Sequence, residues 1–218
     1  KARLGANATL AVSLASARAG AVAAKLPLYR YLRKSWKLEA GSWKLPYGMM
    51  NILNGGAHAG WSVDIQEFMI IPYVAKFSER LRVGSEIFHK LGEILKSRGL
   101  GTLVGDEGGY APRLARNEEA LELIVRAIRE EGYTAGKDVF LAMDAAASEF
   151  YKNAEPQSET AKAGSATGGQ YELKVDGKVL SAKELYKIYA DWLARYPILS
   201  IEDPFAEDDW QAWKLFRK

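Results

Sequence analysis

The chain has 218 residues, 48% of them hydrophobic and 26% charged, an ordinary globular composition with enough apolar side chains for one substantial core. Its formal net charge is +3, and its 30 basic and 27 acidic residues are dispersed without a polybasic run, so we expect no nucleic-acid partner. Cysteine is absent, which excludes disulfides, thiolate metal sites and a cysteine nucleophile, and no apolar segment reaches the length of a membrane span.

The first half of the chain predicts helices, a glycine-rich turn and one strand. Small side chains favour the first helix, a proline begins the second, and apolar residues at helical spacing mark the third. The glycine-rich turn carries His58. In chain order the predicted elements are a helix over 5–25, a helix over 27–33, a loop over 34–48, the turn over 49–61, a strand over 64–72 and a helix over 77–98.

The second half predicts helices alternating with strands, which is typical of βαβ units and of a largely parallel sheet. Asn117 is expected to cap one helix, and a capping box begins another at Ser181. The last helix is still running at the final residue, so we expect a truncated chain. The predicted elements are a helix to about 131, a strand over 139–143, a polar surface loop over 153–169, a short strand over 171–175, a helix over 181–195, a strand over 198–201 and a helix from about 208.

Two of the predicted strands end directly on a carboxylate. Asp144 follows the apolar run 139–143, and Glu202 follows the run 198–201. Strands of this kind are buried on both faces, and the carboxyl ends of parallel strands are where α/β enzymes carry their chemistry. Two neighbouring acids there would form half of a cage for a hard cation such as Mg²⁺. Taken singly, each acid could equally be a helix N-cap or a solvated turn residue.

Three other segments carry candidate site residues. Glu107 lies in the turn Gly105–Gly109, whose glycines allow its side chain to be aimed. Gln66 and Glu67 open a buried strand, where an acid needs a partner or a function. His58 follows two glycines in a loop. Each feature alone is weak, because a glycine-rich turn is usually only a turn and a loop histidine is usually only solvated.

Taken together, the motifs are specific, and they closely resemble enolase, the family of phosphopyruvate hydratases. They occur in the family's order and cover nearly the whole chain. The resemblance implies an α/β fold with an enolase-type β/α (TIM-like) barrel, of which residues 36–218 form the first part, preceded by a helical linker over 1–35. The strings that carry it are LGANATLAVSLA, PLYRYL, MMNILNGGAHA, DIQEFMI, VGDEGGYAP, NEEALELI, AASEFY and YPILSIEDPFAEDDW.

The resemblance implies that Mg²⁺ is the cofactor and that Asp144 and Glu202 are two of its three carboxylate ligands. Asp203 is implied to orient its neighbours. The third carboxylate and the family's lysine base have no matching position in this chain, and neither Lys174 nor Lys178 is a candidate for the base.

The resemblance also implies catalytic and substrate-binding roles. Glu107 matches the general acid that protonates the departing hydroxyl, and Glu67 matches the acid beside it. His58 and Gln66 match positions that contact the substrate, and Asp106 is implied to orient its neighbours. A carboxyl group donates a proton near neutral pH only if its pKa is raised, so the two glutamates are expected to lie close together and titrate as a unit.

The implied activity is that of a glycolytic lyase, which dehydrates 2-phosphoglycerate to phosphoenolpyruvate. The resemblance further implies a homodimer in the cytoplasm, with a cell-surface or secreted pool as an addition. The alternatives are a surface-binding or scaffold role and an inactive truncated fragment. We expect the chain by itself to be inactive, because the base and the third metal ligand have no match in it. We also expect it to be marginally stable, because half a barrel leaves an open sheet edge. Trp61 departs from the small or polar residues usual in the family beside the His58 loop.

Overall fold

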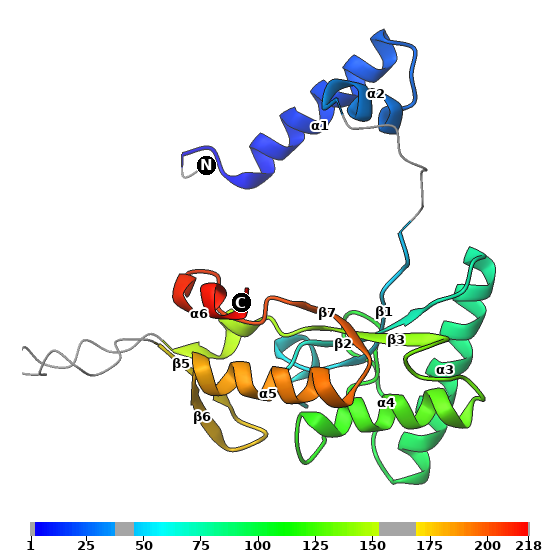
Figure 1. Ribbon diagram of the computed structural model, residues 1–218, viewed down its shortest axis with the longest axis vertical. Coiled ribbons are helices and arrows are strands. Elements are labelled where there is room, and N and C mark those ends of the chain that lie inside the picture. Colours follow the sequence, from blue (N-terminus) through cyan, green and yellow to red (C-terminus); the bar gives the residue numbers. More distant parts are fainter. Residues whose placement is uncertain (1–2, 38–45, 153–168, 218) are drawn as a thin grey trace, which may run out of the picture. The chain divides into compact units, whose positions relative to one another are not determined.

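The computed structural model describes residues 3–37, 46–152 and 169–217 (Figure 1). The chain divides into two units, Lys1–Pro46 and Tyr47–Lys218. Most of the two loops predicted over 34–48 and 153–169 lies outside the described residues.

The first unit contains the two helices expected there. Helix α1 spans Ala6–Ala23 and helix α2 spans Leu28–Ser35. Pro27 precedes α2 as its N-cap, with φ −56° and ψ 145°, rather than standing at the first helical position. Across the described part of the chain, no helix combines the length and the apolar character needed to cross a membrane.

The second unit is built on a four-stranded sheet in the order β1-β2-β3-β7. Its β3–β7 pair is parallel, whereas β1–β2 and β2–β3 are antiparallel, so the expectation of a largely parallel sheet is wrong for these strands. Two successive helices connect β2 to β3, and the chain re-enters the sheet at the end where β2 left it, since Pro72 at the end of β2 pairs with Val139 at the start of β3. The strands are β1 (Met50–Asn54), β2 (Glu67–Pro72), β3 (Val139–Asp144) and β7 (Ile198–Glu202).

A smaller antiparallel sheet in the order β4-β5-β6 follows β3 along the chain. The short strand predicted over 171–175 is present as β5, one residue earlier at its start and two residues shorter at its end. Gly177 has φ +63° in the tight turn that follows. The strands are β4 (Tyr151–Lys152), β5 (Gln170–Leu173) and β6 (Lys178–Ser181).

The helices of the second unit agree with their predicted positions to within about two residues. The capping box is confirmed, since Ser181 accepts from the Glu184 backbone N–H and the Glu184 carboxylate accepts in return. Asn117 directly precedes its helix, but its side chain makes no cap and bonds elsewhere. The elements are η1 (Ala57–Ala59), α3 (Phe77–Ser97), α4 (Glu118–Glu130), η2 (Ala147–Phe150), α5 (Ala182–Arg195) and α6 (Trp210–Phe216).

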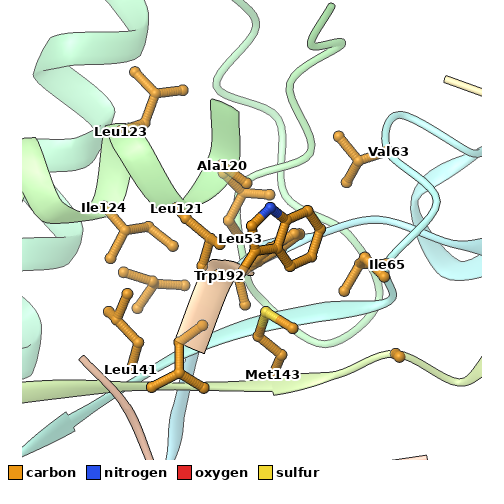
Figure 2. Close-up of a cluster of buried hydrophobic side chains, with 14 of the residues drawn as sticks. Leu53, Val63, Ile65, Ala120, Leu121, Leu123, Ile124, Leu141, Met143 and Trp192 are labelled. Atoms are coloured by element: carbon orange, nitrogen blue, oxygen red, sulfur yellow. The ribbon is translucent and has the colours of Figure 1, made fainter. Parts of the chain in front are cut away.

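The main core lies between one face of the sheet and the helices. Figure 2 shows part of it, in which Leu141 and Met143 of β3 face Leu121 and Ile124 of α4. Fully burying each such side chain stabilises the fold by about 1.5 to 3 kcal/mol. The opposite face of the sheet carries a separate small cluster, formed by Met69, Ile71, Ala142 and Phe140. Successive side chains of a strand point to opposite faces of the sheet. The second face therefore lies outside the main core and can carry polar side chains at one end of the sheet.

Candidate active site

Four polar side chains lie in one row across the four strands. Asn54 pairs with Glu67, Glu67 with Asp144, and Asp144 with Glu202. Paired residues point to the same face of a sheet and stand about 5 Å apart. The three carboxylates therefore lie side by side, and the antiparallel β2 explains how an acid at the start of a strand meets acids at the ends of two others.

Glu107 is held beside this row by amide groups. Its Oε2 accepts hydrogen bonds from Asn54 Nδ2 at 2.6 Å and Asn51 Nδ2 at 3.0 Å, and its Oε1 accepts from Gln66 Nε2 at 3.5 Å. The same Asn54 fixes the turn, because its Oδ1 accepts from the Gly109 backbone N–H at 2.8 Å. A Cβ at Gly109 would lie 2.8 Å from that oxygen, so the close approach requires glycine.

The two asparagines were missed by the sequence analysis. Asn54 is fully buried, and Asn51 stands on the same strand three residues earlier. The signal that could have found them is their position: polar amides at both ends of a short apolar strand, directly before the glycine pair. An amide buried in that setting needs a partner, and here the partner is Glu107.

His58 stands at the open side of the site, on the one-turn helix η1. Its side chain is 47% exposed, and its Nδ1 lies 3.7 Å from Asp106 Oδ2. The Asp106 backbone N–H also donates to the His58 carbonyl oxygen at 3.5 Å. The structure thus brings the His58 loop against the turn that carries Glu107.

Carboxylate crowding dominates the electrostatics. The pKa of Glu67 is raised to about 7, first by burial and then by the neighbouring carboxylates, of which Glu107 has the largest effect. Burial also raises the pKa of Asp144, with a further contribution from Glu202, while the Ala146 backbone N–H opposes this shift by donating to Asp144 Oδ1 at 2.9 Å. Uncompensated negative charge of this kind favours a cation.

The donor set fits Mg²⁺. Within the described ranges no three carboxylate or imidazole groups converge closely enough to hold a metal by themselves. Asp144 and Glu202 nevertheless offer oxygen ligands from adjacent strand ends, and Mg²⁺ is commonly bound through one or two carboxylates together with water and substrate oxygens.

The backbone beside each of these two acids is strained. Ala146 has φ +45° and Asp203 has φ +42°, in the left-handed region that non-glycine residues rarely adopt. The two loops are tied together, because the Ala145 N–H donates to the Glu202 carbonyl at 2.9 Å and the Ala147 N–H to the Asp203 carbonyl at 3.1 Å. Strain maintained by such contacts is characteristic of functional sites.

Carboxylates that gather at one end of a sheet, on the face turned away from the covering helices, are typical of the active sites of β/α-barrel enzymes. Residues 42–218 match the family described as enolase, C-terminal TIM barrel domain. The chain belongs to the enolase family, and the resemblance and the fold class expected from the sequence are confirmed. Within the described residues the strands form an open sheet whose irregular, antiparallel start agrees with the implied barrel.

Proposed function

We propose that this chain serves an Mg²⁺-dependent enolase, a lyase that dehydrates 2-phosphoglycerate to phosphoenolpyruvate in glycolysis. The observation that carries the proposal is the single row of Glu67, Asp144 and Glu202, with Glu107 held beside it. A cytoplasmic location and a homodimer are part of the proposal and rest on the family resemblance alone.

In this proposal, Asp144 and Glu202 hold the metal. The bound cation supplies positive charge against the negative charge that develops on the substrate carboxylate. Glu107 gives a proton to the departing hydroxyl, and Asn54 keeps its carboxyl group aimed. Glu67, with its pKa near 7 and its carboxyl group beside that of Glu107, retains a proton for part of the time at neutral pH.

His58 and Gln66 complete the substrate side of the site. Both come from the segment between β1 and β2, and both approach the turn that carries Glu107. No lysine of the chain matches the family's base, so the groups present account for metal binding, substrate binding and protonation of the leaving group. Binding, rather than turnover, is therefore the direct test for this chain.

The test is calorimetric titration of 2-phosphoglycerate into the protein, in Mg²⁺ and in EDTA. We expect binding that requires Mg²⁺ and that Asp144→Asn weakens at least roughly tenfold, since the variant loses one charged ligand. Asp138→Asn is the matched control, because Asp138 also accepts a backbone N–H, from Thr134 at 2.9 Å, but lies outside the row. Binding that is equal in EDTA, or equal in the two variants, would contradict the proposal.

A second variant separates the acid from the metal ligands. Glu107→Gln keeps the shape of the side chain and removes the proton that it can donate. In an enolase that contains this segment together with the family's lysine base, we expect this variant to lose phosphoenolpyruvate formation and to keep Mg²⁺ affinity. Normal turnover would exclude Glu107 as the acid.

A further inference from the structure

Asp64 is a buried carboxylate that has no part in the catalytic row. It is 1% exposed, and its two oxygens accept three hydrogen bonds. Oδ1 accepts from the Lys174 backbone N–H at 2.9 Å, and Oδ2 accepts from the Val175 backbone N–H at 3.0 Å and from Asn117 Nδ2 at 2.8 Å. Burying a carboxylate costs free energy unless its oxygens accept hydrogen bonds in this way, so we expect Asp64 to have a specific structural role.

These bonds join three segments that are far apart in the sequence. The Asp64 backbone N–H donates to Asn117 Oδ1 at 2.8 Å, and the Asn117 backbone N–H donates to Asp176 Oδ1 at 2.9 Å. Asn117 thus uses its side chain to bind Asp64 instead of capping α4. These bonds hold the loop before β2, the start of α4 and the turn between β5 and β6 together in one hydrogen-bonded cluster, the Asp64 cluster.

The Asp64 cluster lies at the C-terminal end of the loop 55–66, which carries His58. The Gly55 N–H donates to the Gln66 carbonyl and the Gly56 N–H to the Val63 carbonyl, each at 2.8 Å, so the loop is closed on both sides of Asp64. Val63 and Ile65 are fully buried in the main core, where Figure 2 shows them.

The β5–β6 turn also covers the far side of the loop. The Lys174 ammonium lies 5.1 Å from the centre of the Trp61 ring, a cation–π contact. Trp61 has φ +57°, a left-handed conformation that needs outside support in a non-glycine residue. The same turn therefore holds the loop at Asp64 through hydrogen bonds and at Trp61 through its ring.

We propose that Asp64 is a positioning residue: it fixes the loop 55–66 against α4 and the β5–β6 turn, and so places His58 and Gln66 at the site. The consequence for substrate binding rests on the proposed function. The placement of the loop does not, and it can be tested without substrate.

The test variant is Asp64→Asn, which keeps the shape of the side chain and exchanges one acceptor oxygen for an NH₂ donor. Three donors face the two oxygens, so at least one buried N–H must lose its partner. Asp138→Asn is again the matched control. Asp176→Ala is a milder second variant, since it leaves the bonds to Asp64 in place and removes the acceptor of the Asn117 N–H, together with a 3.9 Å ion pair to Lys178.

The readout is the NMR signal of the two imidazoles at fixed pH, together with amide hydrogen exchange. The chain has only two histidines, so His89 on α3 is an internal control for His58. We expect Asp64→Asn to shift and broaden the His58 signal, to leave the His89 signal in place, and to speed exchange at the Gly56 and Trp61 amides at least roughly tenfold relative to α3.

Asp176→Ala should change the same signals in the same direction and by less, which keeps the proposal testable if Asp64→Asn does not fold. Unchanged His58 signals and loop exchange in a folded variant would overturn the proposal. Equal changes in the loop and in α3 would also overturn it, because they would show a general loss of stability. Failure of 2-phosphoglycerate binding by the unaltered protein would count against the proposed function and leave this result standing.

Discussion

At the scale of single residues, two asparagines orient the Glu107 carboxylate, and they differ in the number of hydrogen bonds that they make. Asn54 is fully buried. Its Nδ2 donates a hydrogen bond to Glu107, and its Oδ1 accepts one from the Gly109 N–H. Asn51 donates to Glu107 only, and its own Oδ1 has no hydrogen-bond partner among the described residues. The turn therefore relies on Asn54 far more than on Asn51.

Replacing Asn54 by leucine should lower the free energy of unfolding by about 2 kcal/mol, because the buried Gly109 N–H and the Glu107 carboxylate both lose a partner. Urea unfolding followed by circular dichroism measures the change. Asn51→Leu is the matched comparison and should cost clearly less. If Asn51→Leu lowers the free energy of unfolding as much as Asn54→Leu or more, the hydrogen bond between Asn54 and the Gly109 N–H contributes nothing to stability.

At the scale of elements, helices followed their sequence signals and strands did so less well. Apolar residues at helical spacing located α3, Asn117 located the start of α4, and the Ser181 capping box located α5, because these signals are local. Strand β1 was taken for part of a turn, because two asparagines interrupt its three apolar residues directly before a glycine pair, and its strand conformation depends on its pairing with β2. Local signals likewise could not show that Asn117 gives its side chain to Asp64, which is 53 residues away.

Helix α4 begins with an acid whose charge stabilises the fold. Hydrogen bonds from Arg195 and from Tyr196 Oη, the latter at 2.7 Å, hold the pKa of Glu118 below its ordinary value, although partial burial opposes the shift. A carboxyl group whose pKa is lowered by folding contributes stability above its unfolded pKa, and that contribution disappears as the pH falls through the folded pKa.

Glu118→Gln should therefore lower the free energy of unfolding at pH 7 by about 1 kcal/mol, an amount limited by solvent screening, and by much less near pH 3. Urea unfolding at the two pH values checks this. Glu122→Gln is the control. Glu122 lies on the same helix as Glu118 and pairs at 2.7 Å with Arg116, which precedes the helix, but 43% of its side chain is exposed, so its effect should be smaller. A loss for Glu118→Gln that is the same at both pH values would contradict the electrostatic account.

At the scale of the whole molecule, the site assembles from segments far apart in the sequence, which the folding of the sheet brings together. Asp144 and Glu202 could be expected to meet, because both follow buried strands and adjacent parallel strands end at the same edge. Glu67 opens its strand, so its place in the row depends on the antiparallel pairing of β2 with β3, which two intervening helices impose. No spacing in the sequence shows that reversal, and the family resemblance was needed to group these acids.

The measurement that tests the account most directly is calorimetric titration of Mg²⁺ into the protein and into Glu202→Gln, with Asp208→Asn as the matched control. The row of carboxylates predicts one site in the unaltered protein and in the control, and at least a roughly tenfold weaker affinity in Glu202→Gln, because a neutral amide replaces a charged ligand at the end of β7. Equal Mg²⁺ affinity in all three proteins would contradict the assignment of the metal site to this row.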